Sequence, residues 1–285
     1  MTIKDIIKKY QGKIDQLDLE ILIAHSLGET REFVLTYPEY KIPGLKMFKL
    51  KYEIRRRILK EPLAYILKYK EFYGLNFFVN KNTLVPRPET EMLVENILKV
   101  NPKNKTIIDI GTGSGCIIIS LAKNLKNENE FIAIDASKKA LQVAFKNARK
   151  YDMTKKINFL NGNLLSPVLK SEKNKTSPSK EFIIVANLPY IDDFWKNLDS
   201  CSAELKHEPP MAFIGGIDGL DLYRELSIQI KELLTANRIK KLTAYFEIGH
   251  LQKKEMTKIF SFATKTTFQK DLAGKWRVCE IEIKN

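Results

Sequence analysis

Residues 106–122 read TIIDIGTGSGCIIISLA, and this stretch decides the fold class. An apolar run rich in isoleucine passes through Asp109, three glycines follow within five residues, and a second apolar run begins at Cys116. A glycine loop between a strand and a helix lets the protein backbone approach a nucleotide, while the free N–H groups of the helix face the ligand. The stretch therefore predicts a nucleotide site at the first turn of an α/β sheet.

The spacing of the glycines is Gly-x-Gly-x-Gly, not the Gly-x-Gly-x-x-Gly of dinucleotide sites. This difference favours a nucleoside without a pyrophosphate, and we expect the cofactor to be S-adenosylmethionine. The next apolar stretch ends at Asp135, where a carboxylate can accept hydrogen bonds from both ribose hydroxyls. A tight strand-to-helix turn would also explain the glycines, but the added carboxylate favours binding. The cofactor-binding residues predicted here are Asp109, Gly111, Thr112, Gly113, Ser114, Gly115 and Asp135.

Strand-like and helix-like segments alternate along the rest of the chain, at residues 106–110, 114–125, 130–135, 138–150, 157–160, 181–186, 219–235, 241–247, 251–262 and 276–283. This alternation predicts a parallel sheet covered by helices on both faces. The last segment alternates as a half-exposed antiparallel strand does. We therefore predict an α/β fold of the class I S-adenosylmethionine-dependent methyltransferase type, Rossmann-like and mostly parallel with an antiparallel last strand. The polar stretch 171–180 is expected to be a mobile surface loop.

Residues 1–71 follow a different pattern, because their apolar residues recur at helical spacing. They predict a small N-terminal helical bundle. Residues 72–88 are expected to form a hairpin and a stiff linker, and residues 89–285 the methyltransferase domain. Thr30 is expected to cap a short helix of the bundle, and Thr90 to cap the helix that follows the linker.

Composition excludes several classes of protein. Of the 285 residues, 44% are hydrophobic, which is enough for sizeable cores. No apolar run approaches the roughly 20 residues of a membrane span, and the N-terminus lacks the pattern of a secretory signal. We therefore expect a cytoplasmic protein without membrane contact. The three cysteines and three histidines are too scattered for a disulfide framework or a metal site, so no metal is expected.

The net charge of +14 raises the question of a nucleic-acid partner. The excess is mostly lysine spread along the chain, but a basic run stands out between residues 46 and 60. On a helix such a run is usually a solvated face. The alternative is transient contact with an acidic or RNA-containing partner such as the ribosome.

Residues 183–192 read IIVANLPYID, so a strand-like run ends in Asn187-Leu188-Pro189-Tyr190. In an open α/β sheet, ligands bind beyond the carboxyl ends of the strands, near the switch in strand order. We therefore expect this loop to lie beside the methyl donor. Asn-x-Pro-Tyr is the loop that methyltransferases acting on planar nitrogens use, although a plain β-turn after a strand is the alternative.

Such a nitrogen is a poor nucleophile, because its lone pair is delocalised into the adjoining π-system. The Asn187 side-chain oxygen and the Leu188 carbonyl can both accept from one NH₂ group, and Tyr190 can lie flat against the amide or base. The lone pair is then aimed at the sulfonium methyl, and positioning of this kind is worth several kcal/mol. No strong base is needed, since the nitrogen becomes acidic as it is alkylated.

Further segments stand beside the glycine loop and the Asn187 loop, and together they cover nearly the whole chain: EPLAYIL at 61–67, EFYG at 71–74, LVPRPETEMLVE at 84–95, DIGTGSGCIIISLA at 109–122, IDASKKALQVAFKNA at 134–148, NLPY at 187–190, HEPPMAFIGGIDGLDLYREL at 207–226, EIGHLQ at 247–252 and DLAGKWRV at 271–278. In these segments the chain resembles the protein-(glutamine-N5) methyltransferases of peptide-chain release factors, the HemK/PrmC family. The resemblance implies transfer of a methyl group from S-adenosylmethionine to the glutamine of the release factor's Gly-Gly-Gln loop. It also implies that the N-terminal domain helps to grip this protein substrate.

By the same resemblance, Asn187 contacts both donor and substrate, and Asn163 and Leu164 lie near the donor's adenine. The catalytic residues are then Asn187, Pro189 and Tyr190, and the substrate-binding residues are Asn187, Leu188, Pro189, Tyr190 and Arg87. The chain departs from the family pattern where Leu188 replaces a proline, where Asn163 replaces an acidic residue, and where Lys60 and Lys68 replace glycines.

Three hypotheses stay open at this point. The first is the release factor methyltransferase, which several independent motifs favour. The second is an adenine-N6 methyltransferase of RNA or DNA, which Asn-Leu-Pro-Tyr and the charge favour but the PRPETE segment and the lack of an aromatic-rich basic module disfavour. The third is a ribosome-associated factor that binds S-adenosylmethionine without catalysis, which the intact Asn187 and Tyr190 argue against.

Overall fold

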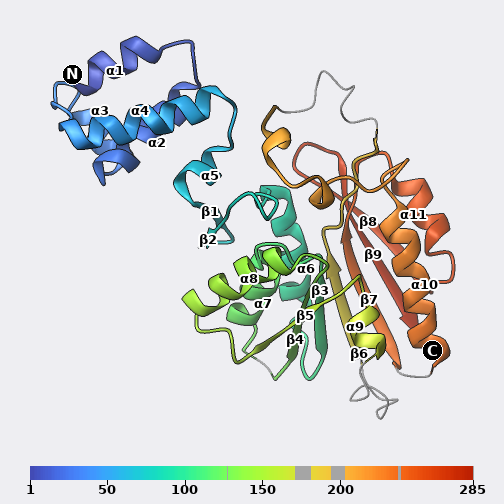
Figure 1. The fold of residues 1–285 in the computed structure, drawn as a ribbon. Helices are drawn as coiled ribbons and strands as arrows, with labels where there is room; N and C mark the ends of the chain where they lie inside the picture. The colour runs from blue at the N-terminus through green and yellow to red at the C-terminus, as the bar shows by residue number, and fades with distance from the viewer. Residues whose placement is uncertain (127, 171–180, 194–202, 237–238, 285) are drawn as a thin grey trace. The chain divides into compact units, whose positions relative to one another are not determined.

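The structure is a computed structural model that describes residues 1–126, 128–170, 181–193, 203–236 and 239–284 (Figure 1). The chain divides into two compact units. The smaller holds residues 1–69 together with 203–207, and the larger holds the other described residues. The loop expected at 171–180 lies outside the described residues, and the domain boundaries expected at residues 71 and 88 stay predictions.

The smaller unit is a helical bundle, as predicted, with Leu22, Ile23 and Leu50 fully buried in its core. Side-chain caps set where several of its helices begin. Thr30 accepts a hydrogen bond from the Phe33 N–H at 3.3 Å, which confirms the predicted cap. The helices are α1 (Ile3–Tyr10), α2 (Gln16–Leu27), α3 (Arg31–Thr36), α4 (Gly44–Ile58) and α5 (Leu63–Leu67).

The larger unit is built on a seven-stranded sheet in the order β5-β4-β3-β6-β7-β9-β8. β9 is antiparallel to both of its neighbours and the other pairs are parallel, which confirms the predicted fold class. The pattern analysis missed β8, because this edge strand is only partly buried and carries lysine at both ends, as edge strands often do. The strands are β3 (Thr106–Ile110), β4 (Glu130–Asp135), β5 (Ile157–Asn161), β6 (Glu181–Ala186), β7 (Lys241–Glu247), β8 (Lys265–Lys270) and β9 (Trp276–Lys284).

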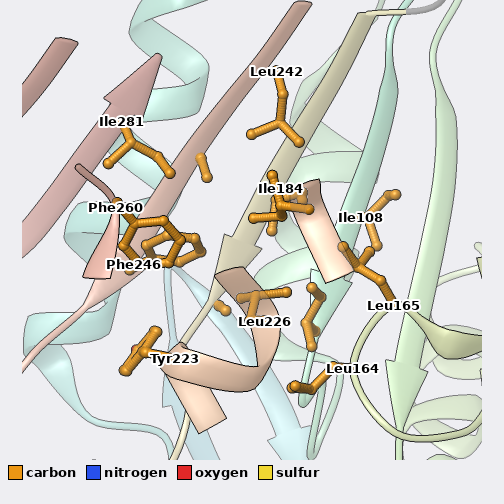
Figure 2. Close-up of a cluster of buried hydrophobic side chains, with 14 of the residues drawn as sticks. Ile108, Leu164, Leu165, Ile184, Tyr223, Leu226, Leu242, Phe246, Phe260 and Ile281 are labelled. Atoms are coloured by element: carbon orange, nitrogen blue, oxygen red, sulfur yellow. The ribbon is translucent and has the colours of Figure 1, made fainter. Parts of the chain in front are cut away.

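Helices cover both faces of this sheet because its central strands are apolar on both sides. Along β3, Ile107 belongs to the core on one face and Ile108 to the core on the other. Figure 2 shows the second core, where Phe246 stacks on Phe260 at 5.2 Å between ring centroids. The first core holds residues of α6 (Glu91–Val100), α7 (Cys116–Asn124) and α8 (Lys138–Lys150), and the second holds residues of α9 (Ser166–Lys170), α10 (Asp221–Thr235) and α11 (Lys253–Ile259).

Two local predictions need correction. The hairpin consists of β1 (Tyr69–Phe72) and β2 (Leu75–Phe78), so its first strand lies before the expected start at residue 72, and it turns at Gly74. Thr90 does precede α6, but its own backbone is already helical and its side chain makes no capping bond. The Thr90 hydroxyl instead donates a hydrogen bond to Glu247, at the end of β7.

Candidate active site

The strand order reverses between β3 and β6, which pair in parallel, and the loops that follow these two strands meet there. A cavity of about 410 Å³ lies at this point, within the range of small-molecule sites. Its lining residues include most of the predicted site, namely Arg87, Gly111, Thr112, Gly113, Ser114, Asp135, Asn163, Leu164, Asn187, Leu188 and Pro189. The two motifs therefore meet at the carboxyl ends of the strands, as the sequence analysis expects, and their binding roles stay predictions.

The glycine loop is fixed by backbone bonds and needs its glycines. The N–H groups of Gly111 and Thr112 both donate to the Ile134 carbonyl, at 2.8 and 3.0 Å. Gly115 has φ of 79°, and a side chain there would come within 2.8 Å of Ile119. The loop thus packs tightly against α7 while its outer surface faces the cavity.

Asp109 was predicted to bind the cofactor, but the structure places it beneath the loop, fully buried and away from the cavity lining. Its Oδ2 accepts a hydrogen bond from the Thr112 hydroxyl at 2.6 Å. Burial raises the pKa of Asp109 to about 7, against the opposing hydrogen bond from Thr112. Asp109 therefore supports the loop from below.

Asp135 ends β4 and lines the cavity. Its Oδ2 accepts from the Gly113 N–H at 2.9 Å, and its Oδ1 accepts from the Ser137 N–H at 2.8 Å. Burial raises the pKa of this carboxyl, and the two backbone bonds partly offset the effect. Each oxygen keeps a second lone pair, so the carboxylate can still accept from the hydroxyls of a ligand.

Asn163 and Leu164 follow β5 and also line the cavity. The Asn163 side-chain N–H donates to Glu225 Oε1 of α10 at 2.5 Å, so its amide oxygen is left for another partner. Leu164 has φ of 49°, an uncommon conformation for a leucine, and is buried. An amide oxygen therefore stands where the family usually has an acidic side chain.

The Asn187 loop is connected to two residues that sequence reasoning missed. The Asn187 side-chain N–H donates to the Thr90 hydroxyl oxygen at 3.0 Å, and Thr90 in turn donates to Glu247 Oε2 at 2.6 Å. Tyr190 donates to Glu247 Oε1 at 3.1 Å. Glu247 is fully buried, and burial raises its pKa, whereas Thr90, Arg277 and Tyr190 oppose the rise.

Tyr190 is thus held differently from the expectation. The residue does not line the cavity, and its hydroxyl is engaged by Glu247 and by Arg277 Nη1 at 3.4 Å. Burial and the nearby Glu247 raise its pKa above the usual value for tyrosine. Its proposed contact with a substrate amide stays a prediction.

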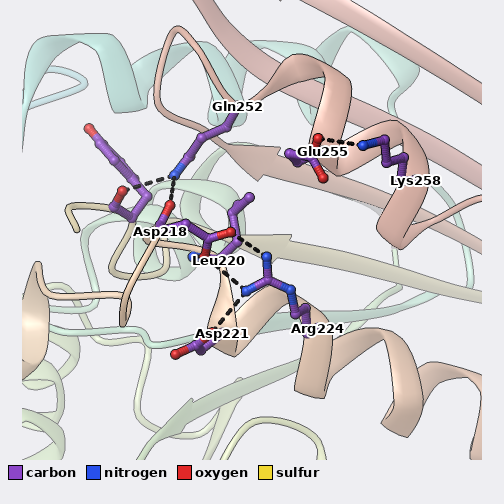
Figure 3. Close-up of polar contacts among 8 residues, drawn as sticks. Asp218, Leu220, Asp221, Arg224, Gln252, Glu255 and Lys258 are labelled. Atoms are coloured by element: carbon purple, nitrogen blue, oxygen red, sulfur yellow. Dashed lines mark hydrogen bonds and ion pairs between the residues drawn. The ribbon is translucent and has the colours of Figure 1, made fainter. Parts of the chain in front are cut away.

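A second loop supports the Asn187 loop from outside. The Ile191 N–H donates to the Phe213 carbonyl, and the Gly215 N–H donates to the Ile191 carbonyl. Gln252 completes this support, because it donates to the Tyr190 carbonyl at 3.0 Å. Figure 3 shows its second hydrogen bond, to the Asp218 carbonyl, at 3.3 Å. The position of the Asn187 loop is therefore set by contacts on several sides.

Arg87, predicted to bind substrate, lines the cavity and is itself oriented by Glu208. The Arg87 guanidinium donates to Glu208 Oε1 at 2.5 Å, and the Val85 N–H donates to Glu208 Oε2 at 2.9 Å. Glu208 is buried, so this pair fixes the stiff PRP segment against the cavity wall. The sequence analysis did not identify Glu208 as the ion-pair partner of Arg87, although Glu208 lies in one of the segments that resemble the family.

No cluster of His, Cys, Asp and Glu that could hold a metal ion occurs among the described residues. Within those same ranges, no helix has the length and apolar character needed to cross a membrane.

A seven-stranded sheet with one antiparallel strand, and two ligand loops at its switch point, define a methyltransferase of the Rossmann-like class. Comparison with known protein families and structures supports the same class. A family described as a methyltransferase domain matches residues 101–187, and one described as the PrmC N-terminal domain matches residues 4–67. The human methyltransferase 10 domain containing protein is 17% identical with a TM-score of 0.50, covering 82% of this chain and 96% of that one, which shows a shared fold alone.

Closer relatives define the family. The release factor glutamine methyltransferase of Flavobacterium psychrophilum is 38% identical over 257 residues, covering 87% of this chain and 84% of that protein. The protein of the same name from Mycoplasma mycoides is 30% identical over 292 residues, covering 100% and 99%. The chain belongs to the release factor glutamine methyltransferase family.

Proposed function

We propose that this enzyme transfers a methyl group from S-adenosylmethionine to the side-chain amide nitrogen of the glutamine in the Gly-Gly-Gln loop of peptide-chain release factors. The observation that carries the proposal is the state of Asn187. One N–H of its NH₂ group donates to Thr90, which fixes the orientation of the amide, and its Oδ1 is the side-chain atom that can accept from a target NH₂ at the cavity. Release factors are the proposed partners, and the cytoplasm is the proposed compartment.

The residues present fit S-adenosylmethionine. The glycine loop offers backbone that a ligand can approach, and Asp135 offers carboxylate lone pairs for ribose hydroxyls. One N–H of the Asn163 amide donates to Glu225, which orients the side chain, and its amide oxygen can accept from the amino group of an adenine. When bound, the donor supplies a sulfonium-activated methyl group.

The catalytic task of the protein is to present the target nitrogen. We propose that Asn187 Oδ1 and the Leu188 carbonyl oxygen accept the two N–H groups of the glutamine amide, with Pro189 fixing the loop, Arg87 bounding the pocket and Tyr190 anchoring the loop through Glu247. Accepting both N–H bonds reduces the planarity of the amide and leaves its lone pair aimed at the methyl carbon. With the donor bound, the target nitrogen would take the methyl group as the C–S electron pair leaves with sulfur, and the proton lost by the alkylated nitrogen would pass to water.

The decisive experiment is mass spectrometry of the glutamine-loop peptide after incubation of a release factor with the protein and S-adenosylmethionine. We expect one added methyl on the glutamine. The Asn187→Ala variant should abolish the transfer while donor binding drops less, and an unchanged rate would contradict the role given to Asn187.

The adenine-N6 alternative is favoured by one observation, the Asn-Leu-Pro-Tyr sequence of the loop. A labelled-methyl assay that offers release factor and ribosomal RNA side by side separates the two substrates. Label on RNA alone would overturn the proposed function in favour of this alternative.

Transient contact with the ribosome or RNA through the basic run at residues 46–60 is a further proposal, and it rests on fewer charges than the sequence suggested. Arg56 pairs with Glu61 at 2.5 Å, and Arg57 pairs with Asp18 at 2.5 Å, so both guanidinium groups serve the bundle itself. Reversing the charge of the exposed Lys51 should lower the association rate at low salt and much less at high salt. A flat salt response would assign the run to a solvated face.

A further inference from the structure

We propose that Thr90 and Glu247 are positioning residues that set which way the Asn187 amide faces, so that its oxygen and not its NH₂ group meets the substrate. The inference deepens the proposed function and rests on it for the identity of the substrate amide. It assigns a task to a buried threonine and a buried glutamate that come from two segments distant in sequence.

The direction of the hydrogen bonds follows from the chemistry of the last acceptor. Hydroxyl donors supply both oxygens of Glu247, Thr90 at Oε2 and Tyr190 at Oε1, so Glu247 acts as the acceptor and the Thr90 hydroxyl gives it its single proton. The Thr90 oxygen can then only accept from Asn187, and within the Asn187 side chain only Nδ2 can donate. The orientation of the amide is thereby decided by protein groups before any substrate arrives.

A second chain of hydrogen bonds holds the same Glu247 carboxylate. Arg277 donates to the Tyr190 hydroxyl oxygen, and Tyr190 donates to Glu247 Oε1. Arg277 is itself held by Asp271, at 3.1 and 3.2 Å. Both carboxylate oxygens of Glu247 therefore accept from a hydroxyl group. These two bonds fix the rotamer of Glu247 and the donor-to-acceptor direction of both hydrogen-bond chains.

Strand register explains why these groups meet. β6 and β7 run in parallel with Ala186 opposite Phe246, so Asn187 and Glu247 are the next residues on neighbouring strand ends. Thr90 reaches them from the turn that opens α6. The same end of the sheet carries the cavity, which Thr90 and Asn187 both line.

The opposite orientation of Asn187 would be unproductive. Its NH₂ group would then face the NH₂ group of the target, two donors without an acceptor, and its oxygen would face the lone pairs of Thr90. Only one of the two acceptors needed for the target amide would remain. Loss of such an orienting contact costs about 10- to 100-fold in turnover where the reacting geometry depends on it.

Three variants test the assignment. Thr90→Val keeps the shape but removes the hydroxyl, Glu247→Gln keeps the shape but lets the chain of hydrogen bonds run in either direction, and Thr90→Ser restores the hydroxyl. The matched control is Thr106→Val, which removes a hydrogen bond of 2.8 Å from a buried threonine to Glu130 at the far end of β3.

We expect Thr90→Val and Glu247→Gln to lower kcat about 10- to 100-fold with the KM for release factor and the Kd for S-adenosylmethionine within about threefold of wild type. Thr90→Ser should recover to within about threefold of wild-type kcat, and Thr106→Val should match wild type. A merely structural role would instead lower donor affinity and turnover together, or leave turnover unaffected, and either result overturns the assignment.

A second readout needs no turnover. In ¹⁵N-labelled protein, the side-chain NH₂ signal of Asn187, assigned by its loss in Asn187→Ala, should shift and exchange faster with water in Thr90→Val but not in Thr106→Val. An unshifted signal overturns the proposed orientation. If wild-type protein methylates no release factor, the proposed function fails, while this signal still tests the orientation separately.

Discussion

Replacement of Gly215 by alanine is the sharpest test of how the substrate loop is positioned. An added Cβ would lie 2.3 Å from the Pro189 carbonyl oxygen and 2.6 Å from that of Gly219. Non-bonded heavy atoms prefer separations of about 3.5 Å, so the Asn187 loop and the Gly215 loop must move apart by roughly 1 Å. A misplacement of about 1 Å at the reacting groups can cost on the order of 100-fold in rate, and overpacking costs about 1–3 kcal/mol in stability.

The assay is kcat/KM for methyl transfer to a release factor, measured well below the unfolding midpoint, with donor binding measured by calorimetry. We expect turnover to fall about 100-fold while the protein stays folded and binds the donor. Gly44→Ala is the matched control, because nothing lies within 4 Å of its added Cβ and Gly44 opens α4 in the helical bundle. Turnover of Gly215→Ala within about twofold of the control would refute the argument that this contact sets the loop.

The other predictions concern strain, pH and donor binding. Exposed Lys60 and Lys68 have φ of 64° and 68°, so changing either to glycine should stabilise the protein by about 1 kcal/mol and raise its unfolding midpoint, whereas alanine should not. Burial raises the pKa of Asp109 from 3.8 to about 7, so folded protein keeps a proton that unfolded protein has lost. Stability should therefore fall as pH rises from about 4 to 7, at up to about 1.4 kcal/mol per pH unit, and denaturant unfolding of Asp109→Asn should show a flatter dependence. Asp135→Asn should weaken donor binding about 10- to 100-fold by calorimetry, since charge-assisted hydrogen bonds are lost.

The sequence predicted the fold and the place of the site because both depend on local pattern. Isoleucine-rich strands followed by glycine or by Asn-Leu-Pro-Tyr identify strand ends, and parallel strands bring their carboxyl ends to one edge of the sheet. Asp135 could be found for the same reason, since it ends a strand adjacent to the glycine loop. These conclusions need no knowledge of which side chains touch.

The partners of the site residues could not be predicted, because they depend on contacts between distant segments. Thr90 looks like a helix cap in sequence, yet its hydroxyl binds Glu247, 157 residues away. Asn163 stands where the family usually has an acidic residue, and the sequence does not reveal that one of its N–H groups donates to Glu225 of α10. One feature of the sequence could have identified Glu247: it is a carboxylate at the end of a mostly apolar strand. That strand, β7, pairs with β6, which ends just before Asn187. Such a buried acid requires donors, and its neighbours supply them.

The replacement of the usual proline by Leu188 illustrates how packing can substitute for a backbone restraint. A leucine restrains the backbone less than a proline does, but the Leu188 side chain is buried and lies 3.3 Å from where a Cβ on Gly111 would be. Leu188 also belongs to the same buried core as Tyr223, whose hydroxyl donates to the Glu247 carbonyl. Since Leu188 packs against the glycine loop on one side and shares a core with Tyr223 on the other, we expect a shift of either neighbour to displace the carbonyl proposed to hold the target nitrogen.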